Sequence, residues 1–395
     1  MGIKDSLARY GRSWSSLRIA LMAVGLGVVG LFAPHSALAS KGLALGLFDD
    51  SSTLGQKNVF PQLKKLNVQV VRITLTWGGK GGVANKRPTH PADPADPAYD
   101  WSTYDRALER ADNVGIQVLF TIVGTPAWAN GGKAPTVAPT NSATLRQFAY
   151  AASRRYSGSY LDPATGKILP RVALWLAWNE PNNPVFLTPQ FVKVKGKWRM
   201  AAPTAYAHIC NAIYGGVHSA GGPEAVACGA TAPRGSNQPR GPRPTIAPLA
   251  FLVAASKAGL HTFDAWAHHP YYGAPNQSPK DRHVGPHAVE LGNISALIAK
   301  VTSLYGKKRI WITEYGYQTR PPDQFFGVSW RKQAAYLREA YNIAKKNPRI
   351  DLFTWFMLRD SPDPASWQSG LMTVNGKKKP SYFVFAELVT GGAGL

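Results

Sequence analysis

The chain has 395 residues, of which 45% are hydrophobic and 17% charged, enough apolar material for one large core or two small ones. This balance excludes an intrinsically disordered chain, and an aromatic content of 11% excludes collagen-like, coiled-coil and low-complexity proteins. Lys and Arg outnumber Asp and Glu by 45 to 22, which gives a formal net charge of +23 and favours anionic partners over cationic ones.

Residues 1–39 have the pattern of a secretory signal peptide. Basic residues precede an uncharged, mostly apolar stretch (19–34), and the small residues Ala37 and Ala39 follow it at the spacing of a cleavage site. A membrane span needs about 20 strongly apolar residues, so a membrane anchor is the weaker alternative. We expect cleavage near Ala39, a secreted or extracytoplasmic protein, and a single catalytic domain over residues 40–395.

After residue 40 the sequence alternates between short apolar runs and amphipathic stretches about eight times. The β-branched runs predict strands at 43–48, 68–76, 117–123, 172–179, 225–231, 262–268, 309–314 and 351–357. The amphipathic stretches predict helices at 54–66, 101–114, 141–156, 203–220, 246–258, 289–305, 330–346 and 382–388. Continuous apolar strands separated by helices indicate a parallel sheet covered by helices, and eight such units predict an α/β fold closed into a (β/α)8 TIM barrel.

An open doubly wound sheet is the competing architecture. That fold usually has a glycine-rich turn after its first strand, whereas the sequence from Gly46 to Asp50 offers no phosphate-binding turn. Three long loops (78–99, 182–202 and 232–245) follow predicted strands, so in a barrel they would surround its C-terminal face, where active sites form.

The two cysteines lie on neighbouring predicted elements. Cys210 falls on a helix and Cys228 on the strand that follows it, so in an oxidising compartment they can form a disulfide; two buried thiols are the alternative. No Cys-x-x-Cys motif or His/Cys cluster indicates a structural zinc, and we predict neither a metal nor a cofactor.

Two glutamates stand at the ends of predicted strands. Glu180 follows the apolar run 173–178, and Glu314 ends the run that starts at Arg309. In a barrel these strand tips face each other across its mouth, and a carboxylate beside apolar residues is costly unless it is paired or hydrogen-bonded. Each glutamate alone is also explained by an ordinary strand end. Their matched positions indicate a site.

Opposed carboxyl groups are what cleavage of a glycosidic bond requires. One protonates the leaving oxygen and the other attacks or stabilises the anomeric carbon. Sugars also stack on aromatic rings, and several aromatic residues fall at or after predicted strand ends, although some of them would serve only as packing. These candidates are Trp77, Trp128, Trp178, Tyr315, Tyr317 and Trp355.

Over residues 43–388 the sequence resembles the clan A retaining glycoside hydrolases, and most closely the region shared by families 5 and 39. The motif Trp178-Asn179-Glu180-Pro181 resembles the acid/base signature of the clan, and residues 312–316, around Glu314, resemble its nucleophile strand. The resemblance implies that Glu180 is the general acid/base, that Glu314 is the nucleophile, and that Asn179 binds the sugar 2-hydroxyl.

Three further motifs extend the resemblance in the same chain order. Arg72, followed by Trp77, is similar to the second-strand pattern in which an arginine supports the nucleophile. His269 and Tyr271 resemble the sixth-strand pair that lines the subsite of the cleaved sugar, and Trp355 resembles the eighth-strand tryptophan that forms its floor.

Charge considerations agree with these implied roles. Arg72 and Tyr271 near Glu314 would keep it ionised, and tryptophans around Glu180 would desolvate it and raise its pKa. The implied function is a secreted retaining β-glycoside hydrolase that acts on an oligo- or polysaccharide by double displacement without a cofactor. The alternative is a catalytically inactive carbohydrate-binding or cell-surface barrel.

Some polar residues have two interpretations. Of the adjacent His268 and His269 only one can face the barrel axis, and we favour His269 because Pro-Tyr follows it. Asp49 and Asp50 either bind sugar hydroxyls or cap the next helix. In the last loop, Asp360 and Asp363 are expected to shape the chain.

The cations cluster at 193–199, at Arg234, Arg240 and Arg243, and at 377–379. One interpretation is solubility and adhesion to an anionic cell envelope. The other is that the first two clusters bind a uronate-bearing or phosphorylated polysaccharide. The sequence has no fingerprint of a nucleic-acid-binding fold, so we expect no nucleic-acid partner. Nothing in it indicates an oligomeric state.

Overall fold

The computed structural model describes residues 42–282 and 287–389. The predicted signal peptide lies outside these residues and stays a prediction. Among the helices that are described, none combines the length and the hydropathy needed to cross a membrane.

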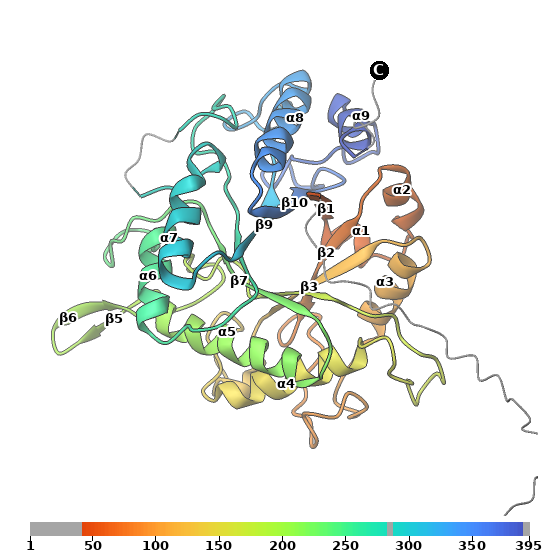
Figure 1. The fold of residues 1–395 in the computed structure, drawn as a ribbon, viewed down its shortest axis with the longest axis vertical. Coiled ribbons are helices and arrows are strands. Elements are labelled where there is room, and N and C mark those ends of the chain that lie inside the picture. The colour runs from red at the N-terminus through yellow and green to blue at the C-terminus, as the bar shows by residue number, and fades with distance from the viewer. Residues whose placement is uncertain (1–41, 283–286, 390–395) are drawn as a thin grey trace, which may run out of the picture. The chain divides into compact units, whose positions relative to one another are not determined.

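Eight parallel strands close into a barrel, which confirms the predicted (β/α)8 fold (Figure 1). Neighbouring strands follow the order β1-β10-β9-β8-β7-β4-β3-β2 around the barrel. Their bounds are β1 (Ala44–Phe48), β2 (Val70–Thr76), β3 (Gln117–Val123), β4 (Leu174–Ala177), β7 (Ala225–Thr231), β8 (Ala265–His268), β9 (Arg309–Tyr315) and β10 (Ile350–Phe356). Each predicted strand overlaps one of these eight.

Helices surround the barrel in Figure 1. They are α1 (Asp50–Thr53), α2 (Phe60–Lys65), α3 (Ser102–Asp112), α4 (Ser142–Arg155), α5 (Ala202–Ser219), α6 (Pro248–Lys257), α7 (Ser295–Tyr305), α8 (Trp330–Lys346) and α9 (Pro380–Glu387), with 3-10 turns η1 (Ala127–Ala129) and η2 (Leu291–Asn293). The predicted helix 54–66 is replaced by α1 and α2. The side chain of Asp49 caps α1 by accepting from the Ser52 amide, and Pro61 lies in the first turn of α2.

Side chains alternate between the two faces of the barrel wall, as the period of a strand requires. The inner face carries a small apolar cluster that includes Leu119, Leu176 and Ala267, whereas the outer face packs against the helices in a much larger core. The barrel is therefore filled with side chains and the polar site lies at its C-terminal end.

One pair of strands was not predicted. Within the loop 182–202, β5 (Phe191–Val194) and β6 (Lys197–Met200) form an antiparallel hairpin. Lys195 and Gly196 connect them with φ angles of 48° and 78°, the left-handed pair that a tight hairpin turn requires. The alternation of apolar and basic residues around a glycine was the signal for this hairpin.

The structure decides between the alternatives for the two cysteines. Cys210 on α5 and Cys228 on β7 form a disulfide with their Cα atoms 6.0 Å apart. The bond ties a helix of the outer layer to the strand that follows it.

Candidate active site

The chain turns sharply where β4 ends. Trp178 and Glu180 have positive φ angles of 67° and 37°, a region that residues with a Cβ rarely adopt. Two backbone bonds hold this turn: Trp178 donates to the carbonyl of Ile122, and Glu180 donates to that of Ala230, each at 2.9 Å. Pro181 follows the turn. The unusual backbone directs the Glu180 carboxyl into the cavity at the barrel mouth, which it lines.

Ala230 can accept that bond because β7 is irregular at its C-terminal end. Gly229 has a φ of 103°, and a Cβ there would lie 2.5 Å from the Trp266 ring. Glycine is therefore the residue that fits this close approach. The pairing of β7 with β8 shifts register between Cys228 and Thr231, which is the extent of this bulge.

Glu314, on β9, is held by two donors. Arg72 Nη1 lies 3.0 Å from its Oε2, and the Tyr271 hydroxyl donates to its Oε1 at 2.8 Å. Both donors are buried, where hydrogen bonds to a charged acceptor are strong. The arrangement stabilises the ionised carboxylate.

Arg72 is itself fixed on several sides. It donates from Nε to the Thr121 hydroxyl at 2.9 Å, from Nη1 to the Thr313 carbonyl at 3.1 Å, and from Nη2 to Asn179 Oδ1 at 2.6 Å. Its guanidinium also lies 4.2 Å from the centre of the Phe48 ring. Because an arginine can only donate, the Asn179 amide must turn its oxygen to Arg72. This leaves the Asn179 NH2 group for a ligand.

Glu180 lies in a different environment from Glu314. Asn183 Nδ2 donates to its Oε2 at 2.9 Å, and His269 Nδ1 lies 3.1 Å from its Oε1. Burial raises the pKa of Glu180, and the hydrogen bond from Asn183 and the charge of Arg72 offset this only in part. The group is therefore suited to carry a proton above the pH at which an ordinary glutamic acid loses it.

His269 lies between the two glutamates. Its Nε2 is 3.3 Å from Arg72 Nη1 and 3.0 Å from the Thr313 hydroxyl, and since arginine only donates, Nε2 accepts and the ring proton is on Nδ1. Burial lowers the pKa of His269 to about 3, which keeps the ring neutral. Nδ1 thus donates to Glu180. The choice of His269 over His268 is confirmed, because His268 instead contacts the Thr231 hydroxyl and the Val289 carbonyl.

The two glutamates converge as predicted. One carboxylate oxygen of Glu180, one of Glu314 and a ring nitrogen of His269 all lie within 4.8 Å of one another. These are also the only three potential ligands of a metal that cluster within the described residues. They do not fit a metal, because one His269 nitrogen carries a proton toward Glu180 and the Arg72 cation already lies beside Glu314.

A cavity of about 690 Å³ opens above the cluster and is lined by both glutamates, Asn179 and Asp50. Asp50 accepts a hydrogen bond from the Thr74 amide and its pKa is raised by burial. Asp49 caps α1 and also accepts from the amides of Leu358 and Arg359, so capping is confirmed for it, although it too reaches the cavity wall.

The predicted tryptophan platforms are wrong in three cases. Trp77 and Trp355 are fully buried, and neither lines the cavity. In β10 the inner face carries Thr354 and Phe356, so the alternation places Trp355 among the outer core residues, where its indole donates to the Ser369 carbonyl. Trp128 packs edge-on against Trp77 and donates to the Ala84 carbonyl, away from the cavity.

Other aromatic residues line the cavity in their place. Phe48 and Phe356 come from β1 and β10, and Trp367 comes from the loop between β10 and α9. Trp367 is 39% exposed, and its ring centre lies 5.3 Å from that of Tyr271 and 5.2 Å from that of Phe356. An exposed indole beside the two carboxyl groups is a platform for a sugar ring.

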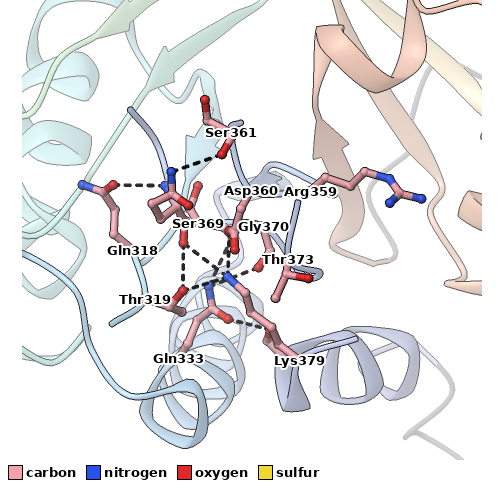
Figure 2. Close-up of polar contacts among 12 residues, drawn as sticks. Gln318, Thr319, Gln333, Arg359, Asp360, Ser361, Ser369, Gly370, Thr373 and Lys379 are labelled. Carbon is pink, nitrogen blue, oxygen red and sulfur yellow. Dashed lines mark hydrogen bonds and ion pairs between the residues drawn. The ribbon is translucent and has the colours of Figure 1, made fainter. Parts of the chain in front are cut away.

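A buried ion pair holds the loop that carries Trp367 (Figure 2). Lys379 Nζ lies 2.7 Å from Asp360 Oδ1 and donates to the Thr319 hydroxyl at 2.8 Å. Asp360 Oδ1 also accepts from the Gly370 amide at 2.9 Å, which confirms that Asp360 shapes the last loop. Lys379 is fully buried, so it does not belong to the exposed basic cluster predicted at 377–379.

The other predicted basic clusters separate in space. Arg234 and Arg243 line the cavity beside Glu180, whereas Arg240 does not. The basic residues at 193–199 lie on the β5–β6 hairpin and contribute nothing to the cavity wall. Of the predicted basic clusters, the loop after β7 is therefore the one that adds positive charge to that of Arg72 at the site.

Sequence analysis missed three residues that complete the site. Thr313 and Asn183 fix His269 and Glu180, and Trp367 covers the cluster. Thr313 and Asn183 are close in sequence to predicted residues, and this adjacency was an available signal. Trp367 had no such signal, since the aromatic rings that it contacts belong to Phe356 and Tyr271, which are distant from it in sequence.

One family model matches the C-terminal part of the chain. Residues 262–385 match the family model described as the glycosyl hydrolase catalytic core. The match runs from before β8 into α9 and includes His269, Tyr271 and Glu314, but it does not reach Glu180 or Arg72. The search of curated proteins found no match.

Solved structures share the fold at low sequence identity. A family 39 glycoside hydrolase from Bacteroides cellulosilyticus WH2 aligns at 19% identity and a TM-score of 0.60, over 89% of this chain and 64% of that one. A glucosidase from Croceicoccus marinus aligns at 15% identity and a TM-score of 0.63, over 87% of this chain and 65% of that one. A monomeric beta-xylosidase from Caulobacter crescentus CB15 aligns at 19% identity and a TM-score of 0.56, over 88% of this chain and 67% of that one. The chain thus spans less than two thirds of the first two proteins.

These similar structures establish the (β/α)8 barrel that the resemblance implies. The C-terminal part of that barrel, residues 262–385, matches the glycosyl hydrolase catalytic core.

Proposed function

We propose that this protein is a retaining β-glycoside hydrolase in which Glu180 is the general acid/base and Glu314 the nucleophile. The observation that carries the proposal is the approach of the two carboxylates, whose oxygens lie within 4.8 Å of each other across the cavity. Retaining enzymes need a separation of about 5 Å, because an inverting enzyme must leave room for a water molecule.

The two environments support this division of labour. Glu314 has a cation and a hydroxyl donor on its oxygens, an arrangement that suits a carboxylate that attacks the anomeric carbon. Glu180 is desolvated by burial, which raises its pKa and keeps a proton available for the leaving oxygen. Once the leaving group departs, the Glu180 carboxylate can deprotonate the water that releases the sugar from Glu314.

The neighbouring groups would position the substrate. Arg72 orients the Asn179 amide, whose NH2 group faces no partner among the described residues and suits the sugar 2-hydroxyl. Trp367 would stack on a sugar ring. The proposed substrate is an oligo- or polysaccharide.

Secretion is a separate part of the proposal and rests on the sequence of residues 1–39. The net charge of +23 supports electrostatic association of the exported protein with an anionic cell envelope. Fractionation of cells that produce the tagged full chain tests both: we expect the protein outside the cytoplasm and shortened near Ala39. Full-length protein in the cytoplasm would contradict export.

The experiment on function is a substrate panel. The protein is incubated with aryl β-glycosides and with neutral and acidic polysaccharides, and a mechanism-based inactivator of retaining β-glycosidases is then applied. We expect hydrolysis of at least one glycoside and mass-spectrometric labelling of the peptide that holds Glu314. Binding of glycans without any hydrolysis would favour the inactive carbohydrate-binding barrel instead.

A further inference from the structure

The cavity continues into a second lobe beside the acid/base residue. This lobe, of about 550 Å³, is lined by Glu180, Tyr271 and Trp367 but not by Glu314. In the proposed function the sugar that bonds to Glu314 occupies the lobe lined by both glutamates, and the leaving part of the substrate lies against Glu180. The second lobe is therefore the place for the leaving part.

Two arginines give this lobe a positive charge. Arg234 and Arg243 both line it, and they come from the loop 232–245, which contains three arginines and neither Asp nor Glu. Arg234 donates to the Tyr272 carbonyl at 2.8 Å and lies 3.3 Å from Glu290 Oε1. Its charge is thus partly balanced, although its side chain remains 44% exposed.

Arg243 has no such balance. Its Nη2 donates to Asn183 Oδ1 at 3.0 Å, and within the described residues it pairs with no carboxylate. Most of its N–H donors are left for a ligand. Asn183 in turn donates to Glu180, so the guanidinium is held one side chain away from the acid/base group.

The lobe has little negative charge of its own. Among the described residues that line it, Glu180 is the one carboxyl group. In the proposed function Glu180 carries the proton that it donates when the reaction starts, and burial raises its pKa in that direction. Two guanidinium groups facing an uncharged wall attract an anion.

We propose that this lobe binds an acidic sugar residue on the leaving side of the scissile bond, with its anionic group against Arg243 and Arg234. The inference rests on the proposed function and names the substrate class: a polysaccharide that carries carboxylate, sulfate or phosphate groups. Guanidinium groups bind all three anions through paired N–H donors. The other lobe is lined by the carboxyl groups of Asp49, Asp50 and Glu314, so the anionic residue is assigned to the second lobe and the cleaved sugar itself is left unspecified.

A strongly basic protein binds acidic polymers anywhere, so the test needs a matched control. Arg240 lies in the same loop as Arg243 and is exposed, but it does not line the lobe. Arg243→Gln and Arg240→Gln therefore change the total charge equally, and only Arg243→Gln removes a group that lines the lobe and contacts Asn183.

The experiment measures kcat/KM of the full-length protein on acidic polysaccharides, each compared with its carboxyl-reduced counterpart, in which the same backbone is neutral. A sulfated and a desulfated polymer form a second matched pair. We expect the wild type to prefer one acidic member, and Arg243→Gln to lower kcat/KM on it by about 10-fold to 100-fold, as loss of one charge-assisted hydrogen bond predicts. Because Arg243 also contacts Asn183, the quantity compared is the ratio of kcat/KM on the acidic member to that on its reduced counterpart. This ratio should fall in Arg243→Gln and stay within about twofold of the wild-type ratio in Arg240→Gln.

Several outcomes would overturn the inference. These are preference for the neutral polymers, equal losses in Arg243→Gln on both members of a pair, and equal effects of Arg240→Gln and Arg243→Gln. If no glycoside is hydrolysed, the proposed function fails, and calorimetric binding of the same oligosaccharides decides this inference by itself. Weaker binding of the acidic oligosaccharide to Arg243→Gln alone would uphold the anion site, and equal binding to both variants would remove it.

Discussion

Two buried cation–carboxylate pairs in this barrel have similar geometry and different surroundings. Arg72 lies 3.0 Å from Glu314, and Lys379 lies 2.7 Å from Asp360. Glu314 lines the cavity, whereas Asp360 is enclosed by the last loop, and burial raises its pKa (Figure 2). A pair that borders the cavity can do chemistry on a substrate, and an enclosed pair can only hold the chain in place.

The other hydrogen-bond partners of the two cations also differ: those of Arg72 belong to the site, and those of Lys379 belong to the loop. Arg72 extends its donors to groups that orient other site residues, among them Asn179 and Thr313. Lys379 donates to Thr319 and Asp360, which fix the loop. Breaking the first pair should therefore change catalysis, and breaking the second should change stability.

Removing the negative charge of the cavity pair has the largest expected effect. Glu314→Gln keeps the shape of the side chain and removes the proposed nucleophile, so kcat should fall by a factor on the order of 10³ or more while the melting temperature stays close to that of the wild type. Initial rates on the best glycoside of the panel measure kcat, and a thermal melt measures the melting temperature. Hydrolysis at the wild-type rate would refute the assignment of Glu314.

The second prediction concerns the acid. Glu180→Ala removes proton donation, which is worth roughly 10²-fold to 10⁴-fold, and the loss should be greatest for glycosides with poor leaving groups. A series of aryl glycosides with leaving groups of increasing pKa measures this slope. Losses that are equal along the series would show that Glu180 does not protonate the leaving oxygen.

Breaking the enclosed pair should destabilise the fold. Lys379→Met leaves Asp360 buried without its cation and should lower the free energy of unfolding by about 3–5 kcal/mol. The double variant Lys379→Met/Asp360→Asn removes the stranded charge and should recover part of that loss. Chemical denaturation measures all three proteins. A double variant less stable than Lys379→Met would contradict this account of the pair.

The smallest expected effect is that of Asn183→Ala, which should shift the pH dependence of kcat/KM. The Asn183 amide donates to Glu180 and favours its ionised form, as do the charges of Arg72, Arg243 and Arg234. Asn183→Ala removes one of these stabilising contacts, so the pKa of Glu180 should rise and the basic limb of the kcat/KM profile should move to higher pH. A shift to lower pH would mean that another group controls this limb.

The fold was predictable because its signals are local. Each strand of the barrel is an apolar run with clear ends, and β3 and β7 were predicted with the bounds that the structure gives. The β5–β6 hairpin was missed although its residues alternate between apolar and basic, because each of its strands has only four residues and both lie in a long loop.

The polar centre of the site was predictable for a related reason. Arg72 and Glu314 lie on strands, and Glu180 lies in the turn directly after one, so the barrel topology brings all three together. The aromatic wall was not predictable, since a one-residue step along a strand moves a ring such as Trp355 to the other face. Trp367 depends on a loop whose path is set by the buried Lys379, which no local pattern reveals.

The central claim is that Glu180 and Glu314 act by double displacement, and the stereochemistry of the product tests it most directly. Proton NMR of a β-glycoside from the panel, recorded during the first turnovers before the anomers equilibrate, identifies the first-formed sugar. The separation of 4.8 Å or less between carboxylate oxygens predicts that it is the β-anomer. Initial release of the α-anomer would show inversion and would contradict the account.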